Sequence, residues 1–366
     1  METADPPHPP ETPETPDTPG TPGTPGTPGT PGSPGVRRTP GTPGTPRRPR
    51  ASGSHRQGAH APGARRALRS ARRRALPYLL IAPTVLALAA VLGYPLVDLL
   101  LLSFQDMTRR QLFSGAAPPW AGLDHYRTIL SDGFFWTVVG RTALFTVVCV
   151  GATMLLAMVV ALLMRRVAPW VRMTMVGVLV AVWAMPIMVA ASIFRWLSDA
   201  DYGVVNWLLG LVPGLDFSKH NWFDNPWQGF AVIAGVVVWG AVPFAAITLQ
   251  AALGQVPAEL EEAAMVDGAR GLQLFRHVTF PVIKPAVVLV TSLSAIWDFG
   301  VFNQIWLMRG GQPEKDYYLL GVYSFIESFA VNRYSVGAAI AVITVLMLLG
   351  GAVVYVRQII RLGGAE

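Results

Sequence analysis

The stretch QVPAELEEAAMVDGARGLQLFRHVTFP, residues 255–281, lies between two long apolar runs. Pro257 suits the first turn of a helix. The acidic residues that follow complement the positive N-terminus of that helix, and they are Glu259, Glu261 and Glu262. Gly268 allows the left-handed backbone conformation that commonly ends a helix. The first half of the stretch therefore predicts a short helix that ends at Gly268.

The second half of the stretch predicts another short helix, joined to the first at the glycine. Leu272, Phe275 and Val278 recur at a spacing of three and form an apolar stripe on one face. Pro281 and Pro285 are expected to stop this helix before the next apolar run. A helix pair with an exposed face rich in acidic residues and alanine is typical of a docking site for another protein.

Outward from this stretch, six apolar segments reach or approach the roughly 20 residues that a helix needs to cross a bilayer. The fifth segment is interrupted once, by Asp298. The expected spans are about 78–104, 142–164, 173–194, 229–253, 285–308 and 334–356.

The composition also favours a membrane protein. Of the 366 residues, 52% are hydrophobic and 14% are charged, and the mean hydropathy is +0.41, whereas soluble domains carry about 25% charged residues. The net charge of +7 lies entirely in residues 1–74, so the remainder lacks the basic excess of a nucleic-acid-binding protein. Cys149 is the only cysteine, which excludes an intrachain disulfide and a cysteine-based metal site.

Residues 1–74 form a segment of their own. The triplet Thr-Pro-Gly repeats almost without variation over residues 18–35 and returns in 39–46, and arginines gather from Arg65 to Arg74. We expect a disordered tail that could contact membrane lipid, because such a composition cannot build a core. Cytoplasmic segments are enriched in Lys and Arg, so we expect a multi-pass protein of the plasma membrane with both termini in the cytoplasm. The segments then inside hold 20 of the 29 basic residues, and the tail supplies 12 of them.

The central stretch resembles a known loop. Glu262-Ala263-Ala264, three residues, Gly268, nine residues and Val278-Thr279-Phe280-Pro281 are similar to the EAA loop of binding-protein-dependent ABC importer permeases, whose pattern is EAA, three residues, G, nine residues and I-x-L-P. Asp267-Gly268-Ala269 and Phe275 resemble the carbohydrate branch, the maltose- and glycerol-phosphate-type permeases, and the ending is typical of their maltose-F-like member. The resemblance covers residues 75–366.

The resemblance implies a fold and a set of partners. The fold is the all-α type I ABC importer permease fold, with six transmembrane helices and a cytoplasmic coupling helix. The function is import of a sugar, a di- or oligosaccharide, together with a second permease subunit, ABC ATPase subunits and an extracellular sugar-binding protein. The residues implied to couple to the ATPase are Glu262, Ala263, Ala264, Asp267, Gly268, Ala269, Phe275 and Pro281.

The ATPase is expected on a separate subunit. A phosphate-binding P-loop needs a lysine that follows glycine, and the three lysines, Lys219, Lys284 and Lys315, follow serine, isoleucine and glutamate. We therefore expect the chain itself to be no enzyme and to hold no cofactor or metal.

Candidate substrate contacts lie near the fifth span. Asp298 is too costly to face lipid, so it is expected to face the bundle interior or a polar cavity, or to pair with Arg141 or Arg195. The candidate pathway residues are Trp297, Asp298, Phe299, Asn303 and Gln304, and Trp306 is a further aromatic side chain that could stack on a sugar ring. The outer segment from Met308 to Pro313 departs from the Thr-x-Gly-Gly-Pro of the family, so its contacts are not carried over.

Three other function classes compete with this interpretation. An ion-coupled secondary transporter would show inverted repeats and several buried charges, whereas Asp298 alone lies well inside a span. A membrane-embedded enzyme would need clustered His, Asp or Cys, and no two histidines have metal-ligand spacing on one helix. A membrane anchor would leave the 255–281 stretch unexplained.

Overall fold

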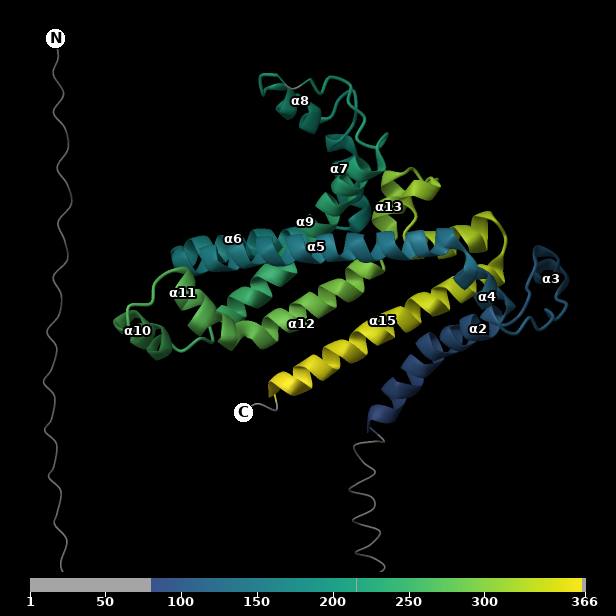
Figure 1. Cartoon of the computed structure of the whole chain (residues 1–366), viewed down its shortest axis with the longest axis horizontal. Helices are drawn as coiled ribbons and strands as arrows, with labels where there is room; N and C mark the ends of the chain where they lie inside the picture. Colours follow the sequence, from purple (N-terminus) through teal and green to yellow (C-terminus); the bar gives the residue numbers. More distant parts are fainter. Residues whose placement is uncertain (1–79, 215, 364–366) are drawn as a thin grey trace, which may run out of the picture. The chain divides into compact units, whose positions relative to one another are not determined.

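The computed structural model describes residues 80–214 and 216–363 (Figure 1). The expected tail, residues 1–74, and the start of the expected 78–104 span lie outside these ranges. Within the described residues every named element is a helix, and the one β-type pairing is an isolated bridge between Gln105 and Trp120. The prediction of an all-α fold is confirmed.

The described chain contains helices of very different lengths. In order they are η1 (Ala89–Gly93), α2 (Tyr94–Ser103), α3 (Arg109–Ser114), α4 (Asp124–Ser131), α5 (Gly133–Arg166), α6 (Pro169–Trp183), α7 (Ile187–Leu197), α8 (Val204–Gly210), α9 (Pro226–Leu253), α10 (Ala258–Val266), α11 (Leu272–Leu274), η2 (Phe275–Thr279), α12 (Phe280–Phe299), α13 (Asn303–Met308), η3 (Lys315–Tyr317), α14 (Leu320–Phe325), η4 (Ile326–Ala330) and α15 (Tyr334–Gly363).

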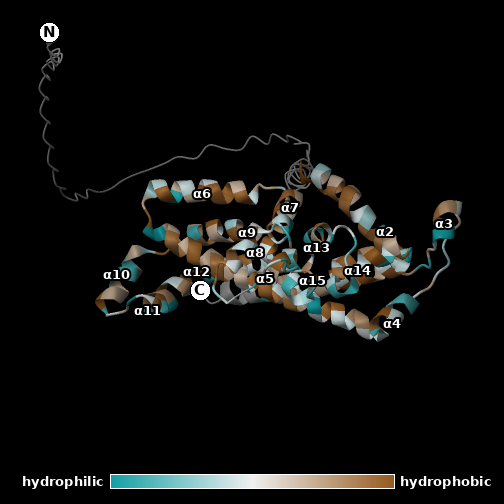
Figure 2. Ribbon diagram, turned by 90° about the horizontal axis from the view of Figure 1, so that it is seen from above, coloured by the Kyte–Doolittle hydropathy of each residue, from teal (hydrophilic) through white to brown (hydrophobic). Residues whose placement is uncertain are grey.

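Five helical stretches are long and apolar enough to cross a membrane: Leu80–Ser103, Gly133–Arg166, Pro226–Leu253, Leu272–Phe299 and Tyr334–Val353. The number becomes six when the bent pair α6 and α7 is taken as one crossing. Hydrophobic residues predominate along these helices (Figure 2). Side chains of the first stretch, including Leu86 and Leu92, are exposed on the protein surface, which suits contact with lipid.

The third expected span, 173–194, is not one straight helix. α6 and α7 meet at an angle of 94° across the break that contains Pro186. Pro186 has no amide hydrogen to donate and has an extended backbone (φ −59°, ψ 134°), so it ends one helix and caps the next. Its carbonyl oxygen accepts from the amides of Val189 and Ala190 at 2.9 and 3.1 Å. The hydropathy of the segment predicted the apolar length but not this bend.

The fifth expected span, 285–308, is displaced in the structure. The helical stretch runs from Leu272 to Phe299 and ends at Gly300, so residues 303–308 belong to the separate helix α13. The prediction that Pro281 and Pro285 stop the preceding helix is wrong. Pro281 lies in the first turn of α12, and the π-helix η2 directly precedes it. A wider π turn relieves the clash between a proline ring and the carbonyl four residues earlier.

Three expected spans are shorter than the helices that contain them. α5 extends past 142–164 to Gly133, α9 extends past 229–253 to Pro226, and α15 extends past 334–356 to Gly363. The carboxylate of Asp132 accepts from the amide of Phe134 at 2.9 Å and so caps the start of α5. Arg165 and Arg166 end this helix, where positive charge is favourable.

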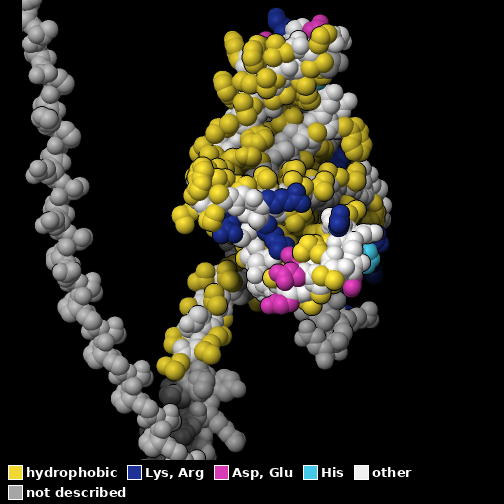
Figure 3. Space-filling view, turned by 90° about the vertical axis from the view of Figure 1, so that its left-hand side faces the viewer, with side chains coloured by type: hydrophobic (Ala, Val, Ile, Leu, Met, Phe, Trp, Pro, Cys, Tyr) yellow, Lys and Arg dark blue, Asp and Glu magenta, His cyan; other side chains and the backbone are white. Residues whose placement is uncertain are grey.

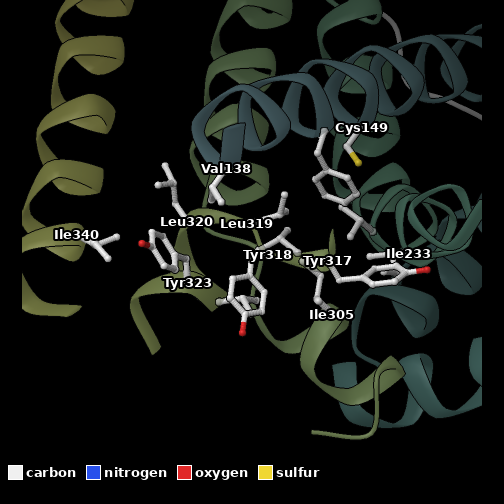
Figure 4. Packing of buried hydrophobic residues seen from close by; sticks show 14 of the residues in the cluster. Val138, Cys149, Ile233, Ile305, Tyr317, Tyr318, Leu319, Leu320, Tyr323 and Ile340 are labelled. Carbon is white, nitrogen blue, oxygen red and sulfur yellow. The ribbon is translucent and has the colours of Figure 1, made fainter. Parts of the chain in front are cut away.

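The buried core has two parts. The larger cluster joins α5 and α9 to α13, α14 and α15, and it includes Val138, Leu320 and Ile340 (Figure 4). The smaller cluster joins α5, α9 and α12, with alanines at the close approach of the first two helices: Ala157, Ala161, Ala245 and Ala246. Small residues let helices pack closely within a membrane.

Candidate coupling loop and transport cavity

The bend after α10 explains the spacing between the alanines and the glycine. The amide of Ala269 donates to the carbonyl of Ala264 at 2.9 Å, and the amide of Gly268 donates to that of Met265 at 3.0 Å. Gly268 has φ +89°, which glycine adopts without a steric penalty. This pair of hydrogen bonds is the Schellman motif that ends many helices. The predicted helix end at Gly268 is confirmed, and Pro257 lies just before the helix as its N-cap.

The second helix of the loop is continuous with a membrane-spanning stretch. Gly271, with φ +52°, turns the chain into α11, and the helix then continues through η2 into α12. This part of the loop and the helix that carries Asp298 therefore form one continuous helical stretch, Leu272–Phe299.

The outer face of the loop is partly apolar. Val266 is 87% exposed and Leu272 is 77% exposed, and the half-exposed Leu260 and Met265 lie on α10 as well. Figure 3 looks onto this end of the molecule, where acidic side chains gather beside Lys and Arg side chains. Exposed apolar groups within a charged surface are a feature of protein docking sites. The sequence predicted the acidic and alanine side chains of this face and the apolar Leu272, but not the exposed Leu260, Met265 and Val266.

The eight predicted coupling residues divide into two groups. Glu262, Ala263, Asp267, Gly268 and Pro281 are exposed. Ala264, Ala269 and Phe275 are half-buried, and the Phe275 ring lies 6.0 Å from that of Phe280 and packs on the smaller core cluster. Phe275 therefore anchors the loop to the helices rather than presenting a contact surface.

Glu261 holds the loop in place. Its two carboxylate oxygens accept from the Arg165 guanidinium at 3.1 and 3.0 Å, and one of them also accepts from the Thr279 hydroxyl at 3.0 Å. The hydrogen bonds from Arg165 lower the pKa of Glu261 below its ordinary value. Because Arg165 is 96 residues away in sequence, no local pattern distinguishes Glu261 from its neighbour Glu262.

Asp298 lines a small, partly open cavity between helices. The side chain is buried, with 4% of the residue exposed, and one carboxylate oxygen has no hydrogen-bond partner among the described residues. The cavity measures about 260 Å³ and lies between the α6–α7 bend, α9 and α12. Trp297 and Gln304 line the same cavity, as do Trp183 and Trp239, which were not among the predicted pathway residues.

Other predicted pathway residues lie elsewhere. Phe299 lines a separate cavity of about 230 Å³ beside α15, and Asn303 is exposed. Trp306 packs between the rings of Phe302 and Phe325, with centroids 5.6 and 4.9 Å away. Only Trp297, Asp298 and Gln304 of the five candidates are therefore brought together.

The alternative expectation for Asp298, that it pairs with Arg141 or Arg195, is wrong. Arg141 instead donates to the carbonyl oxygens of Lys315 and Tyr318 at 2.9 and 3.2 Å. The Arg195 guanidinium lies beside Gly310. Among the residues that the structure describes, no basic group lies within 4.0 Å of the Asp298 carboxylate.

The family model described as "Binding-protein-dependent transport system inner membrane component" matches residues 153–361. The chain belongs to this family. The match includes the coupling loop and the Asp298 cavity, so both features lie in the part of the permease that the family shares. Membership in a binding-protein-dependent family decides against the ion-coupled secondary transporter.

The permease also has close relatives of known name. It is 38% identical over 82% of its length, and 91% of the relative, to the diacetylchitobiose uptake system permease protein DasB of Streptomyces coelicolor. It is 30% identical over 78% of its length, and 91% of the relative, to the sulfoquinovosyl glycerol permease SmoG of Agrobacterium fabrum. The trehalose/maltose permease MalF of Thermococcus litoralis is 28% identical over 77% of this chain and 92% of its own.

Solved structures share the fold of the permease. A chain of a bacterial ABC transporter that imports the acidic polysaccharide alginate superposes with a TM-score of 0.66 at 21% identity, covering 80% of this chain and 99% of that one. A chain of a bacterial alginate ABC transporter in complex with an alginate pentasaccharide-bound periplasmic protein gives a TM-score of 0.65 at 20% identity, covering 78% of this chain and 94% of that one. The predicted type I importer permease fold is confirmed.

Proposed function

We propose that the chain is the membrane-spanning permease subunit of an ATP-driven importer for a disaccharide or short oligosaccharide. Family membership and the sugar uptake named for its relatives support this. The observation that carries the proposal is the coupling loop, whose exposed apolar face and fixed bend continue directly into the helix that lines the Asp298 cavity.

The proposed partners follow from this function. A second permease would complete the translocation pathway, two ATPase subunits would bind the loops of the two permeases, and an extracellular binding protein would deliver the sugar. ATP hydrolysis would occur on the ATPase subunits, because none of the three lysines of this chain follows a glycine. We place both termini in the cytoplasm, residues 1–74 as a tail and residues 75–366 as the permease domain.

The proposed docking surface consists of α10 and the turn after it. Val266 and Leu272 would enter a cleft of the ATPase as apolar contacts, and Glu262 and Asp267 would meet basic groups at its rim. Ala263 is small and exposed, so it would allow close approach of the two surfaces. Ala264, Ala269, Phe275 and Pro281 would hold the shape of the loop.

The proposed sugar site is the cavity around Asp298. Tryptophan rings at Trp183, Trp239 and Trp297 offer flat apolar surfaces, which suit the C–H faces of sugar rings, and Asp298 and Gln304 offer hydrogen-bonding groups. A volume of about 260 Å³ lies below the roughly 300–1,000 Å³ of most ligand sites. This chain would therefore supply one wall of a larger cavity shared with the second permease, and alternating access would open it to either side.

Reconstitution tests the proposal. The complete importer in proteoliposomes, with ATP inside and the binding protein outside, should accumulate a radiolabelled sugar. N,N′-diacetylchitobiose, maltose and trehalose are the first sugars to try. Absence of ATP-dependent uptake for every sugar tried, with all partners assembled, would contradict the proposal.

A charge reversal tests the docking surface. Glu262→Lys should prevent copurification of the ATPase, whereas Glu259→Lys, at an exposed position on the same helix, should not.

A further inference from the structure

α5 is held by hydrogen bonds at both of its ends. At the Arg166 end, the Arg165 guanidinium binds both carboxylate oxygens of Glu261 on α10, and Thr279 of η2 donates to the same carboxylate. The Glu261 side chain is only 18% exposed. A bidentate Arg–carboxylate pair of this kind restricts both the distance and the relative orientation of the two side chains.

In the half of α5 nearer Gly133, Arg141 and Thr142 bind the segment Lys315–Leu320. The Arg141 guanidinium donates to two carbonyl oxygens of this segment, those of Lys315 and Tyr318. On the next residue, the hydroxyl of Thr142 accepts from the amide of Leu320 at 3.1 Å. Both interactions use main-chain groups of the segment, so they fix its backbone to the helix.

The helix between these two ends is suited to transmit a displacement. α5 has 34 residues and contains no proline, and its attachment points Arg141 and Arg165 are about 36 Å apart at 1.5 Å per residue. Its neighbours α9 and α12 each contain a proline inside the helix, Pro243 and Pro285. Prolines are common sites of helix kinks, and of these three helices α5 is the one without a proline.

We propose that Glu261 is a positioning residue that joins the coupling loop to α5, so that ATP-driven movement of α10 displaces α5 as a rigid body and thereby moves the Lys315–Leu320 segment through Arg141 and Thr142. This inference rests on the proposed function. In this proposal Glu261 does not contact the ATPase. The ATPase displaces the neighbouring exposed side chains of α10, and the Glu261–Arg165 hydrogen bonds transmit that displacement to α5.

The test measures sugar transported per ATP hydrolysed in the reconstituted importer. Glu261→Gln keeps the shape of the side chain and weakens the bond to Arg165. We expect normal copurification of the ATPase and continued ATP hydrolysis. The number of sugars transported per ATP should fall by about 5-fold or more, which is the lower end of the factors by which coupled sites affect each other. Glu259→Gln, on the same helix and exposed, is the matched control and should leave the ratio unchanged.

A double variant tests the connection between the two ends. Arg141→Gln should lower the ratio on its own, and Glu261→Gln together with Arg141→Gln should be no worse than the stronger single variant, because both interrupt one path. If the two single-variant losses in the transport ratio multiply in the double variant, the proposal is overturned.

Two results for Glu261→Gln alone would also overturn it. One is an unchanged transport ratio. The other is loss of ATPase copurification, since that would make Glu261 a contact residue. If the unaltered importer transports no sugar, it is the proposed function that fails.

Discussion

The hydroxyl oxygen of Thr142 accepts a hydrogen bond from the amide of Leu320, 178 residues later in the chain, at 3.1 Å. Both residues are completely buried. The same hydroxyl donates to the carbonyl of Val138 at 2.8 Å, so its hydrogen-bonding capacity is used in both directions. This one side chain therefore satisfies a main-chain amide that has no other acceptor within α14.

Thr142→Val should lower the free energy of unfolding by about 1–3 kcal/mol, because it leaves the buried amide of Leu320 without an acceptor. Thermal unfolding of the purified importer in detergent measures the change. Thr137→Val is the control: its hydroxyl also donates to the carbonyl four residues earlier but is exposed, so it should have little effect. Equal losses in both variants would refute the assignment.

Gly337→Ala should destabilise the permease by about 1–3 kcal/mol, the usual cost of overpacking. A Cβ at this position would lie 2.6 Å from the carbonyl oxygen of Ser324 and 2.9 Å from the amide nitrogen of Ser328. Gly350 lies on the same helix with open space around it, and Gly350→Ala should be neutral or stabilising. The same unfolding experiment compares the two, and a Gly337→Ala protein as stable as the original would disprove the close contact.

Gly268→Ala should weaken attachment of the ATPase. An alanine at φ +89° costs about 1–2 kcal/mol, and the strain is relieved by unwinding the Schellman turn that shapes the docking surface. Copurification of the ATPase at increasing detergent stringency measures the effect. Gly177→Ala, at an exposed helical position with open space, should bind the ATPase normally; equal binding by both variants would show that the bend is unimportant.

Trp297→Leu should raise the KM for sugar uptake by about tenfold, equivalent to about 1.4 kcal/mol, because it removes an aromatic wall of the Asp298 cavity. Phe299→Leu alters an aromatic residue two positions later that lines a different cavity, and it should leave the KM unchanged. Initial uptake rates at varied sugar concentration and saturating ATP distinguish the two variants. A larger rise in KM for Phe299→Leu than for Trp297→Leu would instead assign the sugar site to the cavity beside α15.

The attachment of the coupling loop should survive mild acid. Because Arg165 holds the pKa of Glu261 below its ordinary 4.5, the stabilisation is present above the unfolded pKa and is lost as pH falls through the lower, folded value. Hydrogen exchange of the α10 backbone amides, corrected for the intrinsic rate, should be constant from pH 7 to about pH 5 and should increase only below this ordinary carboxyl pKa. Glu261→Gln should exchange faster throughout and lack this transition; an identical transition would assign it to another carboxyl group.

The coupling loop shows how far sequence reasoning reaches. The helix end at Gly268 follows from local rules, because the Schellman bonds join residues at most five positions apart. The choice of Glu261 over Glu262 as the buried anchor does not, because it depends on an arginine 96 residues away. Likewise, the cost of burying Asp298 predicts that it avoids lipid, but not that Trp183 and Trp239 share its cavity.

By itself the sequence determined the helical class, the apolar length of the crossings, the position of the loop and the family, because hydropathy, capping and motif spacing act over a few turns of one segment. Only the tertiary structure decided that the third crossing bends by 94° at Pro186 and that the fifth begins at Leu272 despite two prolines. It also decided that α5 is held at both ends. These features depend on how distant helices share space and hydrogen bonds, and the energies of such contacts are not encoded in any one stretch of the chain.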